Sequence, residues 1–153
     1  MPSATTRPRT QCPDCGAAYT VLADSCGARF NTLLSLDHAR REPWGSRHGQ
    51  AFAAFALQHP GEFSMSLDRA WAALYRIYVA GDRPTWVFEQ LMSDPRSFPA
   101  EWQVPPRSER PIGTPSITIA DLGDFEPTTY PSRLDAWCRA ALVMWGLRDG
   151  GSG

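Results

Sequence analysis

The chain has 153 residues, of which 42% are hydrophobic and 11% aromatic, and a formal net charge of −1 at pH 7. This length and apolar content suffice for one domain with a hydrophobic core, and they exclude an intrinsically disordered chain. The near-neutral charge gives no reason to expect binding to nucleic acid or to an anionic membrane. All 15 basic residues are arginine, which excludes lysine chemistry such as a Schiff base or a P-loop.

No apolar run is long enough to cross a membrane, and the polar N-terminal stretch lacks the apolar segment of a secretory signal. We therefore expect a cytoplasmic protein, in which cysteines are reduced, metal-bound or buried rather than joined in disulfides. Residues 1–10 and 150–153 are expected to be flexible tails on either side of a single domain over residues 11–149.

In chain order, hydrophobic periodicity and capping residues first predict two helices joined by a short turn. The first helix begins near Asp24 or Ser25 and ends before Pro43, because the residue before a proline is disfavoured in a helix. The second helix runs from about Ser46 to Gln58 and is ended by the proline that follows it closely. Residues 48, 52, 55 and 59 then lie on one continuous face of the second helix.

Three more helices are predicted in the rest of the chain. Ser66 can cap the third helix, which ends at Gly81, a residue suited to the turn after a helix. The fourth helix starts at Pro84 and stops before Pro95. The last helix covers about Pro131 to Arg148, where apolar residues recur with helical spacing.

The segment between the last two helices is expected to be irregular. Residues 95–115 contain six prolines and should form an ordered surface loop, since Phe98 and Trp102 can anchor it. Thr118 and Asp121 match a capping box in outline. A small strand is expected only near the first cysteines or at residues 117–119, so the fold class is mainly α with about five helices.

The sequence QCPDCG at residues 11–16 is typical of half a zinc-binding site. A Cys-x-x-Cys pair in a tight turn can place both sulfurs on one metal ion, and Gly16 permits the turn. A redox pair is the alternative, although no helix follows the turn and no βαβ pattern surrounds it. Zinc needs two further ligands, and the candidates are Cys26, His38, His48, His59 and Cys138.

The predicted helical hairpin narrows these candidates. The short turn before the second helix makes the first two helices antiparallel neighbours, so Cys26 and His59 lie at the same open end. His48 is roughly 16 Å from His59 along an unbroken helix, so one metal ion cannot bind both. We therefore predict that residues 11–16 form an N-terminal zinc knuckle docked on this hairpin. The chain would then be a single zinc-binding helical domain with the ligands Cys12, Cys15, Cys26 and His59.

Each candidate also has a plainer interpretation. Cys26 can be a buried thiol, and His59 can be a histidine favoured by the helix dipole. His48 can bond a backbone carbonyl or a carboxylate instead of a metal. His38 is expected to be solvated, and Cys138 is expected to pack in the core. The third helix carries an aromatic stripe that is also expected to be core, with one tyrosine at a cavity: Trp71, Tyr75 and Tyr78.

Several of these stretches together resemble a bacterial family of unknown function. They are CPDCGA at residues 12–17, the lone Cys26, HGQAFAAFALQHPG at residues 48–61 and TIADL at residues 118–122. Members of that family carry Cys-Pro-x-Cys-Gly, a cysteine before a helix, and a helix that ends in Tyr-Ala-x-Gln-His-Pro-Gly. The resemblance extends from about Cys12 to Trp145.

The resemblance implies which positions matter, without implying a reaction. Its motif positions in this chain are Cys12, Cys15, Cys26, His48, Gln58 and His59. This chain departs from the family pattern at Ala53, where an aspartate is common, and at Phe55, where a tyrosine is usual. An activity that depends on those two polar groups would therefore be absent or different here.

Three functions are compatible with the sequence. The first is an accessory or interaction protein with a closed structural zinc site, because three thiolates and one imidazole lower the Lewis acidity of the metal. The second is a zinc enzyme with an open metal position next to His48 or His59 and with hydrolytic or thiol chemistry. Its proton-transfer or substrate-binding candidates are His48, Gln58 and Asp24.

The third and lesser possibility is a nucleic-acid-binding zinc protein. Arginines near the knuckle favour it, whereas the acidic residues of the same region and the slightly negative chain oppose it. We therefore expect a protein or small-molecule partner rather than nucleic acid, with no role for a membrane.

Overall fold

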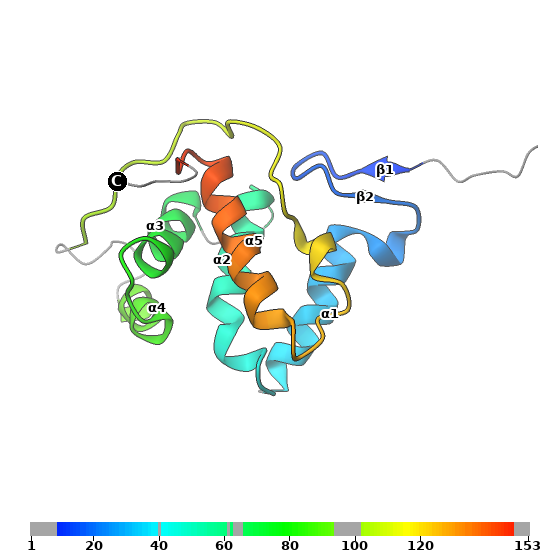
Figure 1. Ribbon diagram of the computed structural model, residues 1–153, viewed down its shortest axis with the longest axis horizontal. Helices are drawn as coiled ribbons and strands as arrows, with labels where there is room; N and C mark the ends of the chain where they lie inside the picture. Colours follow the sequence, from blue (N-terminus) through cyan, green and yellow to red (C-terminus); the bar gives the residue numbers. More distant parts are fainter. Residues whose placement is uncertain (1–8, 40, 61, 63–65, 94–101, 149–153) are drawn as a thin grey trace, which may run out of the picture.

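The computed structural model describes residues 9–39, 41–60, 62, 66–93 and 102–148. Residues 1–8 of the flexible tail predicted at residues 1–10, the tail predicted at residues 150–153 and the predicted anchor Phe98 lie outside the described residues. Thr10, at the end of the first predicted tail, belongs to a short strand instead. The described part contains five α-helices, which confirms the mainly α fold (Figure 1). They are α1 (Cys26–His38), α2 (His48–Gln58), α3 (Leu67–Tyr78), α4 (Pro84–Ser93) and α5 (Tyr130–Met144).

The remaining regular structure is short. Strands β1 (Thr10–Gln11) and β2 (Ala18–Tyr19) pair antiparallel around the knuckle, with Thr10 opposite Tyr19. This confirms the small strand predicted near the first cysteines. Residues 117–119 form no strand. The single-turn 3₁₀ helices are η1 (Leu22–Asp24), η2 (Gly45–Arg47) and η3 (Ile119–Leu122).

Helix α2 is the centre of the molecule and contacts the other four helices. Its sequence is apolar on almost every side, as expected of a helix that is buried all round. Four alanines along it are fully or almost fully buried, and their small side chains let the neighbouring helices approach closely. Helix α1 runs in the opposite direction to α2, and the knuckle lies above the upper end of α1 (Figure 1).

The predicted capping residues perform their role. Ser25 accepts a hydrogen bond from the backbone N–H of Ala28 at the start of α1, and Ser66 accepts one from Arg69 at the start of α3. Thr118 and Asp121 form the predicted capping box, which begins the short η3 helix rather than an α-helix. These local signals therefore identified the starts of three elements correctly.

Helix α5 ends four residues earlier than the sequence predicted, at Met144 instead of Arg148. Gly146 adopts a left-handed conformation with φ of +114° and turns the chain away from the helix axis. The carbonyls of Met144 and Trp145 accept hydrogen bonds from Ile112 and Ser108 instead of continuing the helix. A contact with a distant segment therefore sets this end.

The proline-rich segment over residues 102–117 is an ordered strap, as predicted for the part of the loop that is described. In Figure 1 it crosses over the end of α5 and runs from the side of α3 to the side of the knuckle. The side chain of Trp102 is buried, and the indole N–H of Trp71 donates to the carbonyl of Pro105 at 2.7 Å. The strap therefore connects the α3 side of the core to the knuckle.

The core predictions are confirmed for Trp71 of α3 and Cys138 of α5, whereas Tyr75 and Tyr78 are half-buried and pack against the core. Cys138 is fully buried, and its thiol lies 3.6 Å from the carbonyl oxygen of Gln50. Tyr78 packs partly against the core and uses its hydroxyl to bridge two polar side chains. It accepts a hydrogen bond from Gln50 at 2.6 Å and donates one to Asp135 at 2.7 Å. This network satisfies the polar groups at the junction of α2, α3 and α5.

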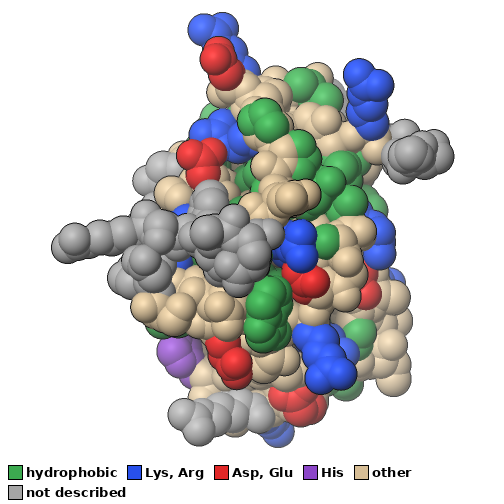
Figure 2. All heavy atoms as spheres, turned by 90° about the vertical axis from the view of Figure 1, so that its left-hand side faces the viewer, with side chains coloured by type: hydrophobic (Ala, Val, Ile, Leu, Met, Phe, Trp, Pro, Cys, Tyr) green, Lys and Arg blue, Asp and Glu red, His purple; other side chains and the backbone are tan. Residues whose placement is uncertain are grey.

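None of the helices in the described part of the chain has both the length and the apolar character that crossing a membrane requires. Figure 2 shows the face that includes α3 and α4, where positive and negative side chains are interspersed. No extended area of a single charge is visible on this face (Figure 2).

Candidate metal centre

The knuckle is a tight turn between β1 and β2. The backbone N–H of Cys12 donates to Ala17 at 2.8 Å, and the N–H of Gly16 donates to the carbonyl of Cys12 at 2.9 Å. Gly16 has φ of +82°, which is accessible to glycine without strain. A Cβ atom at this position would also lie only 3.0 Å from Thr114 of the strap. The turn therefore requires glycine for two independent reasons.

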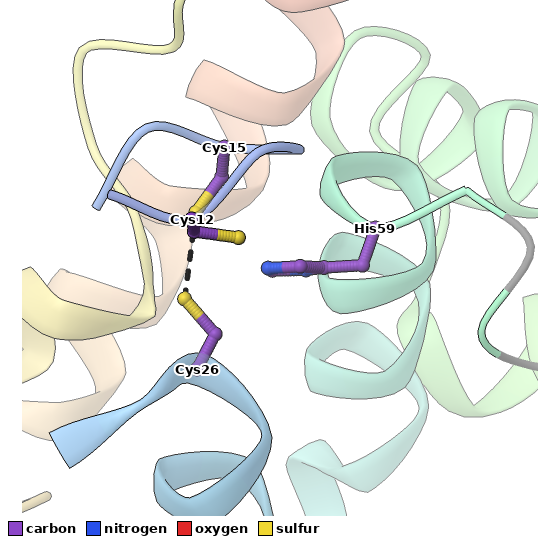
Figure 3. Close-up of side chains that lie close together, drawn as sticks. All are labelled: Cys12, Cys15, Cys26 and His59. Atoms are coloured by element: carbon purple, nitrogen blue, oxygen red, sulfur yellow. Dashed lines mark hydrogen bonds between the residues drawn. The ribbon is translucent and has the colours of Figure 1, made fainter. Parts of the chain in front are cut away.

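Two helix ends supply the other half of the site. Cys26 is the first residue of α1, and His59 is the residue that follows α2. The antiparallel arrangement of the two helices brings both residues under the knuckle, as the sequence predicted (Figure 3). The imidazole of His59 points toward the three cysteine side chains (Figure 3).

The spacing of the four side chains fits a metal ion. One ligand atom from each of Cys12, Cys15, Cys26 and His59 lies within 4.8 Å of all the others. The sulfurs of Cys15 and Cys26 are 3.5 Å apart. Tetrahedral zinc with bonds of about 2.3 Å to sulfur would space two sulfurs by about 3.8 Å. The four residues therefore lie close enough together to bind a metal ion.

A hydrogen bond at Nδ1 fixes the orientation of the His59 ring. Nδ1 donates to the carbonyl of Phe55 at 3.1 Å, which leaves the lone pair on Nε2. The ring also stacks on Phe55, with the ring centres 3.9 Å apart. Nε2 is buried and has no hydrogen-bond partner within the described residues. A buried acceptor that faces three thiols and lacks a partner is typical of a metal ligand.

The electrostatics of the cluster favour negative charge on sulfur. The hydrogen bond with Cys26, together with His59, lowers the pKa of Cys15 to about 4 despite its burial. The same hydrogen bond with Cys15, with burial, raises the pKa of Cys26. Burial alone would lower the pKa of His59, but the nearby Cys15 sulfur and its negative charge outweigh burial and raise that pKa. The cluster thus supplies a thiolate, the form in which cysteine binds metals.

The other candidate residues lie outside this cluster. Nδ1 of His48 is 2.8 Å from the carboxylate of Asp37, which matches the plainer interpretation of a bond to a carboxylate. His38 is exposed, as predicted. Asp24 is also exposed and forms an ion pair with Arg29 at 3.8 Å. Among the described residues, the Cys₃His cluster is the one group of three or more cysteine, histidine or carboxylate side chains placed to hold a metal.

Gln58 is buried with both ends of its amide engaged. Its nitrogen donates to the carbonyl of Ile117 at 2.9 Å, and its oxygen accepts from the indole of Trp137 at 3.0 Å. The side chain therefore ties α2 to the strap and to α5. This placement favours a structural role for Gln58 over the substrate-binding role considered from the sequence.

Replacing Gln58 with leucine is expected to lower the free energy of unfolding by about 2–4 kcal/mol, because two buried polar groups lose their partners. Denaturant unfolding would measure the change. Gln103→Leu is the matched control, because residue 103 is exposed and the same substitution there should change stability by less than about 0.5 kcal/mol. Equal stabilities for the two variants would contradict the structural role of Gln58.

The sequence analysis did not identify Asp37 as the carboxylate partner of His48. A signal was present, because residues 30, 33 and 37 recur with helical spacing and place Asp37 on the buried stripe of α1. A carboxylate on such a stripe needs a buried partner. The histidine that begins the next helix is that partner.

An open groove of about 740 Å³ adjoins the knuckle. One wall is the knuckle turn at residues 11–16, and the other is the strap at residues 110–114. Cys12 and Cys15 line the groove from the metal side, and Met144 also lines it. The knuckle is therefore accessible from outside along this edge.

Comparison with known proteins identifies a family but no described function. No curated protein and no solved structure matches the chain. A family model described as a family of unknown function, DUF5946, matches residues 10–146, which include all four residues of the cluster. This confirms the resemblance seen in the sequence, and the chain belongs to the family of unknown function DUF5946.

Proposed function

We propose that Cys12, Cys15, Cys26 and His59 hold a zinc ion that stabilises the fold. The observation that carries this proposal is the buried Nε2 of His59, which lacks a partner among the described residues and faces three sulfurs. Thiolate and imidazole donors suit zinc, whereas magnesium and calcium prefer oxygen ligands. The metal would join the knuckle, α1 and α2 at one point.

The arrangement favours a structural metal over a catalytic one. With His59 as the fourth ligand, a tetrahedral ion has no open position for water or substrate. Three thiolates also reduce the Lewis acidity that hydrolysis needs. The proton-transfer candidates give little support to a zinc enzyme, because His48 lies at the opposite end of α2 from the cluster and the amide of Gln58 is engaged on both sides.

We further propose an accessory or interaction role in the cytoplasm, with a protein or small-molecule partner at the knuckle. The open groove beside the metal ligands supports this role. An exposed apolar side chain lies in the strap segment that forms one wall of the groove: Ile112, which is 65% exposed. The net charge of −1 favours such a partner over nucleic acid.

Metal removal tests the structural role directly. Elemental mass spectrometry of the untagged full-length protein is expected to find about one zinc per chain. A chelator should then abolish the cooperative thermal transition in circular dichroism at about 222 nm, and added zinc should restore it. Added magnesium is the control and should not restore it. An unchanged melting temperature after complete zinc removal would disprove the structural role.

A further inference from the structure

A second polar cluster lies at the opposite end of α1 and α2 from the knuckle. Asp37 comes from the last turn of α1, His48 is the first residue of α2, and Tyr130 is the first residue of α5. Nδ1 of His48 donates to one carboxylate oxygen of Asp37 at 2.8 Å. The ends of three helices thus bring together a carboxylate, an imidazole and a phenol.

Burial within this cluster is strongly asymmetric. The side chain of Asp37 is 4% exposed, whereas that of His48 is 47% exposed. The hydrogen bond to Asp37 fixes the proton on Nδ1, so the lone pair is on Nε2. Nε2 makes no hydrogen bond with another described residue. A desolvated carboxylate therefore orients an imidazole whose basic nitrogen is left for solvent.

Two further polar atoms in the cluster lack partners among the described residues. They are Oδ1 of Asp37 and the hydroxyl of Tyr130, and both are buried. Burial and the negative charge of Asp37 raise the pKa of Tyr130, so the two groups lie near one another and the phenol keeps its proton. A water molecule between them would satisfy both, as is usual for buried polar groups.

The cluster is not suited to a metal ion. Asp37 and His48 are not part of any group of three metal-ligating side chains found among the described residues. The positive charge of Arg47 acts in the opposite direction to that of Asp37 on the pKa of Tyr130, so Arg47 also lies near the cluster. Arg47 forms an ion pair with Glu42 at 3.8 Å. Acid–base chemistry fits this set better than cation binding does.

We propose that Asp37 and His48 form an acid–base site, in which Nε2 of His48 accepts a proton from water or from a small hydroxyl compound at the protein surface. Asp37 is the positioning residue, and its second oxygen binds a buried water shared with Tyr130. The site is remote from the metal and does not depend on the zinc proposal.

The reaction assigned to this site by the proposal is the hydrolysis of an activated ester. Nε2 removes a proton from water as the water oxygen bonds to the acyl carbon, and the resulting imidazolium is stabilised by the carboxylate of Asp37. The bond from the acyl carbon to the leaving oxygen then breaks, and the leaving group receives the proton from Nε2. The imidazole returns to its starting form, so no oxidant or second reactant is needed.

The first test is the tautomer of His48, measured by ¹⁵N NMR of the full-length protein at a pH at which the ring is neutral. We expect a proton on Nδ1 of His48, and a mixture dominated by the Nε2–H form for the exposed His38, which is the internal control. Asp37→Asn should shift His48 toward the behaviour of His38. A proton on Nε2 of His48 in the parent protein would contradict the proposal.

The second test uses 4-nitrophenyl acetate as the probe and follows the release of 4-nitrophenolate. We expect His48→Gln to lower the steady-state rate by about tenfold and Asp37→Asn to lower it as well, with His38→Gln unchanged. Zinc content should be the same in all four proteins, so a failure of the metal proposal would be seen separately. Equal rates for the parent and His48→Gln would overturn the proposal, even if Asp37→Asn failed to fold.

Discussion

Replacing Cys15 with serine is expected to abolish tight zinc binding and to unfold the domain near physiological temperature. The hydroxyl of serine stays protonated at neutral pH and is a poor zinc ligand. Structural zinc sites in small domains contribute about 10–16 kcal/mol, whereas a domain of this kind is stable by about 5–15 kcal/mol. Circular dichroism, solubility and zinc content of the purified variant would measure the effect.

Cys138→Ala is the matched control for this experiment. Cys138 is a buried cysteine like Cys15, but it packs between α2 and α5, outside the cluster. Its replacement removes one sulfur from the core and should cost about 1–2 kcal/mol without loss of zinc. A Cys15→Ser protein as soluble and heat-stable as the parent would rule out a structural metal.

Replacing His59 with alanine is expected to weaken zinc retention by more than about 100-fold, because even supporting residues around a zinc ligand change affinity by about 10–100-fold. The variant loses the one nitrogen donor of the cluster and leaves three thiolates around the ion. Competition with a chromophoric chelator would measure the dissociation constant. The variant should also admit water to the vacated position, which gives an open zinc site for comparison.

His48→Ala is the control for this second experiment. His48 lies on the same helix as His59 but bonds Asp37, so its removal should leave zinc affinity unchanged. Loss of zinc from His48→Ala would show that the placement of the two histidines is wrong. Equal retention by the parent and His59→Ala would instead assign the fourth ligand position to another group and favour an open, catalytic metal.

The clustering of Cys12, Cys15, Cys26 and His59 was predictable from the sequence because each step depended on local rules. The Cys-x-x-Cys turn, the serine cap before Cys26 and the proline after His59 each fix a short stretch of backbone. The short connection between the two helices then makes them antiparallel. The rise per residue of an α-helix then excludes His48 as a ligand, because it places His48 too far from His59 for one ion to bind both.

Features that depend on distant contacts were not predictable in this way. Gly146 was a local signal for the early end of α5, but the hydrogen bonds from Ser108 and Ile112 of the strap that hold this end are not revealed by any local pattern. The hydrogen bond between Asp37 and His48 forms only when α1 packs on α2. The exposure of apolar residues on the strap likewise depends on the path of the strap over the core. Periodicity identifies the buried face of a helix without identifying its neighbours.

All four ligands of the cluster precede α3 in the chain. A metal ion bound there would close a loop of roughly 50 residues, and a cross-link that closes a loop of this length lowers the entropy of the unfolded chain by the equivalent of about 4 kcal/mol. During synthesis, the complete ligand set leaves the ribosome before α3, α4 and α5 do. Metal capture can therefore precede the burial of α2 by α3 and α5, and the zinc supply at the ribosome would then set how much of the nascent chain reaches the folded state.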